Sequence, residues 1–112
     1  MKKPVMNRKL ILEERVDVPN GGGGFDVTWS SLGTVWAELR ARTGTEAVVA
    51  GADRTRQRYR VVVRGTPYGA PSRPRPDQRF REGARVYPIF AVTEFDRDGH
   101  YIICDCEVGA LT

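Results

Sequence analysis

The sequence predicts a mainly β protein: a small antiparallel β-barrel or sandwich of about six strands, with one short α-helix and two long flexible loops. Runs of alternating apolar and polar residues recur along the chain, and clusters of glycine, proline and aspartate separate them. One segment alone has helical spacing. Strands at this spacing are typical of small barrels and sandwiches. With 112 residues, the chain suits a single domain, residues 1–112.

The first strand is expected at residues 9–18. Its apolar side chains fall on one parity, namely Leu10, Leu12, Val16 and Val18. Residues 19–24, with glycine at each of Gly21, Gly22, Gly23 and Gly24, predict a flexible hairpin tip, because glycine tolerates positive φ and loses the most entropy on ordering. No Gly-Lys-Ser/Thr follows, so this is not a phosphate-binding loop. A second strand is expected at residues 25–30.

Residues 34–42 alternate in a run short enough for a strand or a helix, and the β-branched and aromatic start favours a strand. Residues 44–57 are the helical candidate, with Thr45 as a cap and Glu46 in the first turn. Residues 58–64 give the clearest strand pattern. Its inward candidates are Tyr59, Val61 and Val63.

Residues 65–78 predict an irregular, flexible arm, because proline lacks the N–H that a strand ladder needs. Its prolines are Pro67, Pro71, Pro74 and Pro76. A strand is expected at 85–95, where Pro88 suggests a sheet edge or a bulge. Residues 96–100 form an Asp-Gly turn, and 101–108 the last strand.

The sequence shows no constellation for catalysis, no metal site and no cofactor motif. Cys104 and Cys106 lie two residues apart on a predicted strand, which is poor disulfide geometry and too few ligands for zinc, so we expect buried, reduced thiols. His100 with Asp96 and Asp98 fits a solvated turn better than a metal site. No apolar run approaches the ~20 residues of a membrane span.

The net charge of +4 permits contact with nucleic acid without requiring it. Two groups of arginines are candidates for DNA phosphates, or for acids across subunit interfaces. The first lies on one face of the 58–64 strand: Arg58, Arg60 and Arg64. The second lies in the proline-rich arm and at its exit: Arg73, Arg75, Arg79, Arg81 and Arg85. No base-reading motif accompanies them, so such contact would be independent of DNA sequence.

Several individually weak motifs follow one another along nearly the whole chain. They are the glycine tip with Phe25 and Trp29, Val35-Trp36-Ala37-Glu38-Leu39, Gly44-x-Glu46, Tyr59 to Arg64, Phe80-x-x-Gly83-x-Arg85-Val86-Tyr87-x-Ile89, and Cys104-x-Cys106-Glu107. In this order the motifs resemble the phage head–tail joining family, also called head-closure or stopper proteins. The chain departs from the family pattern in its proline-rich arm and at Pro88.

The resemblance implies a structural virion protein, made in the bacterial cytoplasm, that acts at the head–tail junction of a phage, prophage or gene transfer agent. It would form a ring of six or twelve copies between a portal or adaptor ring and a tail-terminator or tail-tube protein. It would retain packaged double-stranded DNA, with residues 19–24 and 65–78 as docking or gating elements. The alternatives are a tail-terminator or adaptor ring protein, or a non-specific nucleic-acid-binding β-barrel.

Overall fold

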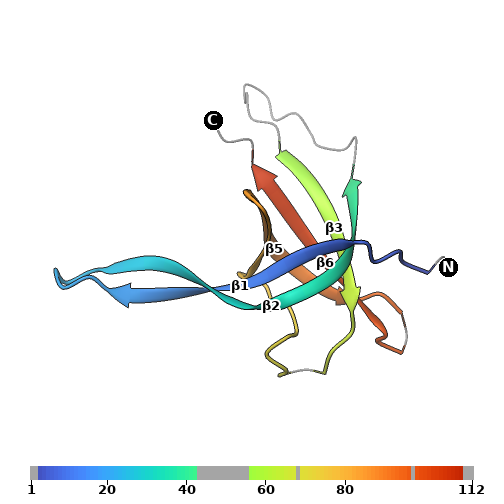
Figure 1. Ribbon diagram of the computed structural model, residues 1–112, viewed down its shortest axis with the longest axis horizontal. Helices are drawn as coiled ribbons and strands as arrows, with labels where there is room; N and C mark the ends of the chain where they lie inside the picture. Colours follow the sequence, from blue (N-terminus) through green and yellow to red (C-terminus); the bar gives the residue numbers. More distant parts are fainter. Residues whose placement is uncertain (1–2, 43–55, 68, 97, 110–112) are drawn as a thin grey trace.

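Six antiparallel strands pair in an order that closes on itself, β1-β2-β3-β6-β5-β4, with β4 pairing back to β1. The computed structural model describes residues 3–42, 56–67, 69–96 and 98–109. The strands are β1 (Arg8–Pro19), β2 (Phe25–Arg42), β3 (Arg56–Arg64), β4 (Arg79–Glu82), β5 (Arg85–Glu94) and β6 (Tyr101–Gly109). The mainly β prediction is confirmed, and the closed order makes the fold a barrel (Figure 1).

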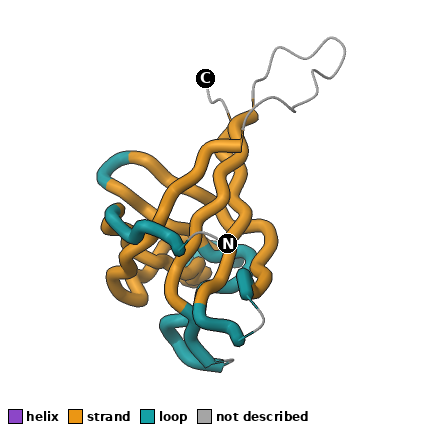
Figure 2. The backbone as a smooth tube through the Cα atoms, turned by 90° about the vertical axis from the view of Figure 1, so that its right-hand side faces the viewer, coloured by secondary structure: helices purple, strands orange, loops and turns teal. Residues whose placement is uncertain are grey.

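The core fills the barrel with side chains that alternate along the strands, as expected for strands with one buried face. Its buried residues are Leu10, Leu12, Ala37, Val61, Val63, Phe80, Tyr87, Ile89, Ile102, Cys104 and Cys106. Tyr59 packs edge-on against Tyr87, with ring centroids 5.1 Å apart. The loops lie at the ends of the strands (Figure 2). The core therefore leaves the strand ends and the outer faces free for contacts.

The second strand runs unbroken over Phe25–Arg42, so the expected separate strands at 25–30 and 34–42 are one element. Leu12 pairs with Gly33 and Glu13 pairs with Ser31, which leaves Leu32 as an extra residue. This is a β-bulge, and Gly33 sustains it at a φ of 138°. The bulge reverses the alternation along β2, which is why the sequence suggested a break.

Beyond the bulge, β1 and β2 continue as a two-stranded ribbon that leaves the barrel (Figure 1). From here on, the arm means residues 14–30, and residues 65–78 are called the proline-rich segment. The arm is the long projection at the left of the view, and its tip marks one end of the molecule's 52 Å long axis (Figure 1). No arm residue belongs to the buried core cluster. The barrel thus carries an element that its own packing does not explain.

The strand β4 was not predicted, and the expected strand 85–95 ends at Glu94. β4 has four residues with one core side chain, Phe80, which is too short for an alternating pattern. Residues 56 and 57 of the predicted helix 44–57 belong to β3, and the rest of that segment lies outside the described residues. No helix that could cross a membrane occurs among the residues the structure describes.

Candidate docking surfaces

The glycine-rich tip of the arm is organised by Asn20. Its Oδ1 accepts hydrogen bonds from the backbone N–H groups of Gly22 at 2.9 Å and Gly24 at 3.2 Å. The Asn20 N–H also donates to the Gly24 carbonyl at 3.1 Å. Gly21 and Gly23 adopt φ values of 83° and 88°, a region that favours glycine. The tip is therefore a defined turn, and the sequence reasoning missed the part that Asn20 plays in it.

The arm has two distinct faces, because paired residues of a hairpin share a face. One face carries the pairs Arg15–Trp29, Asp17–Val27 and Pro19–Phe25. On this face the side chains of Phe25 and Val27 are 66% and 47% exposed. The opposite face carries Val16 and Val18, opposite Thr28 and Asp26, and Val18 is 42% exposed. An apolar stripe of Phe25 and Val27 thus lies open on one face, which we call the outer face.

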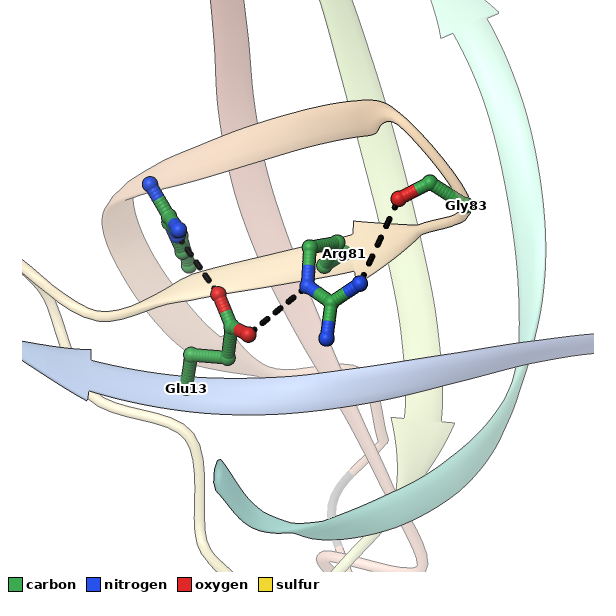
Figure 3. Close-up of polar contacts among 4 residues, drawn as sticks. Glu13, Arg81 and Gly83 are labelled. Carbon is green, nitrogen blue, oxygen red and sulfur yellow. Dashed lines mark hydrogen bonds and ion pairs between the residues drawn. The ribbon is translucent and has the colours of Figure 1, made fainter. Parts of the chain in front are cut away.

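A buried carboxylate braces the root of the arm against β4. Glu13 Oε1 accepts from Arg79 Nε at 2.7 Å, and Glu13 Oε2 accepts from Arg81 Nε at 2.7 Å (Figure 3). The Arg79 guanidinium also lies 4.0 Å from the centroid of the Trp29 ring, a cation–π contact. The brace therefore joins β1, β2 and β4 where the arm leaves the barrel.

The pKa of Glu13 is lowered by this arrangement. Burial by itself acts to raise the pKa, but the hydrogen bonds from Arg81 and Arg79 and their charges outweigh it. A matching ion pair lies at the other end of β4, where Arg8 Nε donates to Glu82 Oε2 at 2.8 Å. The hydrogen bond from Arg8 lowers the pKa of Glu82. Three arginine–carboxylate contacts, two at Glu13 and one at Glu82, thus fasten β4 to β1.

The proline-rich segment is irregular, as predicted, and part of it is packed into the protein. Pro74 is fully buried, whereas Pro67, Pro71 and Pro76 are exposed. The buried Arg73 donates from Nη1 to the Thr66 carbonyl at 2.6 Å. Since a buried guanidinium needs acceptors, Arg73 serves the loop's own structure and is not available to DNA.

The remaining candidate arginines do not gather at one site. Arg58 lies 5.5 Å from the Phe90 ring centroid, Arg60 lies 3.7 Å from Asp105, and Arg64 is exposed. Val62 has the same parity as these three arginines on β3, but it is fully buried. On the other side, Arg75 is 67% exposed and 3.7 Å from Glu14. The predicted arginine groups therefore lie on two sides of the barrel. In the part of the chain that the structure describes, six of the seven arginines from Arg58 to Arg81 contact other groups of the same chain, all except Arg64.

An apolar groove lies on the barrel beside the N-terminal segment, with a cavity volume of about 430 Å³. Its lining residues are Met6, Thr34, Val35, Trp36, Val63, Arg64, Thr66 and Ser72. The Trp36 side chain is 56% exposed. The backbone N–H of Val5 donates to Glu38 Oε2 at 3.2 Å, which holds the N-terminal segment against β2. The sequence showed no local sign of this groove, because its walls come from distant segments.

The two cysteines and the histidine, which could carry chemistry, lie in the core and in a turn. Cys104 and Cys106 are free and buried, as predicted, and burial raises the pKa of both thiols, that of Cys106 to about 12. His100 Nδ1 lies 3.3 Å from Asp96 Oδ2 within a turn. No group of three metal-ligating side chains occurs within the described ranges. These features define a structural class of protein: in the described residues the polar side chains hold the protein's own strands and loops, and exposed apolar side chains lie on the arm and at the groove.

Comparison with known proteins gives the family. The model of the phage head completion protein family matches residues 1–109, and the chain belongs to this family. It is therefore a structural protein of the virion, and the resemblance to head-closure proteins is confirmed.

Two solved structures share the fold. A chain of the "virion of native gene transfer agent (GTA) particle" is 44% identical, with a TM-score of 0.82 over 98% of this chain and 100% of that one. Protein SF1141 from Shigella flexneri 2a is 16% identical, with a TM-score of 0.70 over 100% of both chains, which shows the fold alone. None of the curated proteins matches the sequence significantly.

Proposed function

We propose that the protein forms a ring at the head–tail junction of a phage-like particle, closes the DNA-filled head and docks the tail. The observation that carries this is membership of the head completion family together with a braced arm that projects from the barrel. The 44% identical chain of a gene transfer agent virion favours that kind of particle. The protein acts as a structural component and not as an enzyme.

The ring would contact three kinds of partner: its own copies, a portal or adaptor ring on the head side, and a tail-terminator or tail-tube protein on the tail side. The tip at residues 19–24 and the exposed part of residues 65–78 are the elements best placed to dock or gate. Among the candidate arginines, Arg58, Arg64 and Arg75 are exposed enough to meet packaged DNA. Such contacts would be screened strongly by salt.

A gene deletion with complementation tests this function. Particles made without the gene should be heads that lack tails and lose DNA to added nuclease, and the wild-type gene should restore both. A gene for the barrel with a shortened arm should restore protein level but not tailed particles. Tailed, nuclease-resistant particles in normal number without the gene would contradict the proposal.

A further inference from the structure

The outer face of the arm has a stripe that no residue in the described chain covers. Phe25 and Val27 are 66% and 47% exposed, next to each other on one face of a two-stranded ribbon. Adjacent exposed apolar side chains on a protein surface often mark a contact site. The stripe ends at Trp29, which Arg79 covers at 4.0 Å. The open part of the stripe therefore lies toward the tip, away from the barrel.

The apolar groove beside Trp36 is a second uncovered surface on the same chain. It combines the half-exposed indole of Trp36 with Met6, Val35 and Val63 in a volume of about 430 Å³. This space can accept an aromatic side chain together with its neighbours. Aromatic residues inserted into such pockets dominate the energies of many interfaces.

The arm cannot fill the groove of its own chain. Both are parts of strand β2: residues 34–36 line the groove, and the arm is the other end of that strand beyond the bulge. The β1–β2 pairing and the Glu13 brace hold the arm straight. The N-terminal segment, which contributes Met6, lies at the opposite end of the long axis from the arm tip (Figure 1).

The charge of the arm is opposite to that of the rest of the chain. The arm holds Glu14, Arg15, Asp17 and Asp26, a net charge of −2, while the whole chain carries +4, so the rest of the chain carries +6. On the outer face Arg15 pairs with Asp17, whereas Glu14 and Asp26 lie on the opposite face. Arg64 lines the groove, and within the described residues neither Arg64 nor Asp26 has an ion-pair partner. An acidic arm and a basic remainder of the chain favour contact between the arm of one copy and the body of another over contact between two arms.

We propose that the arm of one copy docks in the Trp36 groove of the next copy, with Phe25 and Val27 as the apolar anchors. The contact is head-to-tail, because arm and groove are different surfaces of the molecule. Head-to-tail contacts with rotational closure produce cyclic rings. The inference rests on the proposed ring function and assigns the surfaces that close the ring.

Cysteine cross-linking in assembled particles tests this contact. The particles carry Val27→Cys at one of the two anchor positions together with Thr34→Cys at the groove; both positions are exposed, and Phe25 and Trp36 stay in place. A short bis-maleimide should produce a ladder of multimers of this chain, because each copy supplies one arm and one groove. The native thiols are buried and should not react. Adding Phe25→Ser should lower the ladder yield roughly tenfold or more, the expected cost of losing a buried aromatic anchor.

The matched control places the second cysteine at Thr93, an exposed position on β5 outside the groove, and should give no ladder. Absence of the ladder, or cross-links from Val27→Cys to another virion protein, would overturn the contact while the junction role stands. Absence of this protein from tailed particles would overturn the junction role itself. The two failures are therefore distinguished by whether the chain is present in the particle.

Discussion

At the scale of single residues, Glu13 connects more of the structure than any sequence pattern indicated. Its two carboxylate oxygens bind Arg79 and Arg81, and its side chain is 6% exposed. Charge-assisted hydrogen bonds of this kind are about twice as strong as neutral ones. Glu13 is thus the residue that ties the root of the arm to β4.

We expect Glu13→Gln to lower the free energy of unfolding by about 2 kcal/mol, because it removes one charge from a buried carboxylate with two charged donors. The measurement is urea unfolding at pH 7. Glu14→Gln is the control, since Glu14 is 38% exposed and 3.7 Å from Arg75, and it should change stability by less than about 0.5 kcal/mol. Equal midpoints for the two variants would contradict the role of Glu13.

The lowered pKa values of Glu13 and Glu82 predict acid sensitivity. A carboxyl with a lower pKa in the folded state binds protons less readily there than in the unfolded chain. Its stabilising contribution is present above its ordinary pKa of 4.5 and is lost as pH falls through the folded value. The urea midpoint should therefore fall between pH 6 and pH 3. Glu13→Gln should show a smaller fall, and an equal fall would argue against the brace.

The buried thiols predict chemical inertness. Burial, followed by the nearby charge of Asp105, raises the pKa of Cys106 to about 12, so the thiol stays protonated at pH 8. A disulfide-exchange reagent should label neither cysteine in the folded protein over minutes, and both after urea is added. Rapid labelling of one cysteine in the folded state would show that the core opens more readily than the packing implies.

At the scale of elements, the arm and the barrel are separable parts. None of residues 16–28 belongs to the core cluster, and the brace uses Glu13 and Trp29, which lie outside that range. We expect replacement of residues 16–28 by Asn-Gly to leave the barrel folded, with a free energy of unfolding within about 1 kcal/mol of the wild type. Urea unfolding checks this, and loss of cooperative unfolding would show that the arm is part of the folding unit.

The sequence predicted the strands that bury one face. It missed the continuity of β2 and the existence of β4. Alternation identified β1, β3, β5 and β6, because a strand with one buried face has a period of two. The bulge at Leu32 hid the continuity of β2. Strand β4 escaped because charged residues surround its single core residue, Phe80. A local pattern cannot show that these charged side chains form ion pairs with residues of the distant strand β1.

The candidate site was predictable to the same extent. The glycine tip was found, since glycines mark a turn directly. The turn chemistry of Asn20 was available from its type and position but was not used. The brace had no local signal, because Glu13 and Arg79 lie 66 residues apart. Burial of Arg73 ran against the expectation for a charged residue in a proline-rich loop.

At the scale of the whole molecule, a barrel with a rigid arm suits assembly into a ring better than action as a monomer. The barrel supplies a fixed frame, the brace sets the direction of the arm, and in the proposed ring the groove of the next copy receives it. A small domain would also gain stability from such contacts by mass action. The proposed ring would leave the proline-rich segment and the strand ends available to partners above and below it.

Cryo-electron microscopy of the head–tail junction in purified particles tests the central claim most directly. We predict a closed ring of this fold between the portal and the tail, around the DNA channel. A particle whose junction lacks the fold, while the tail is attached and the DNA retained, would contradict it.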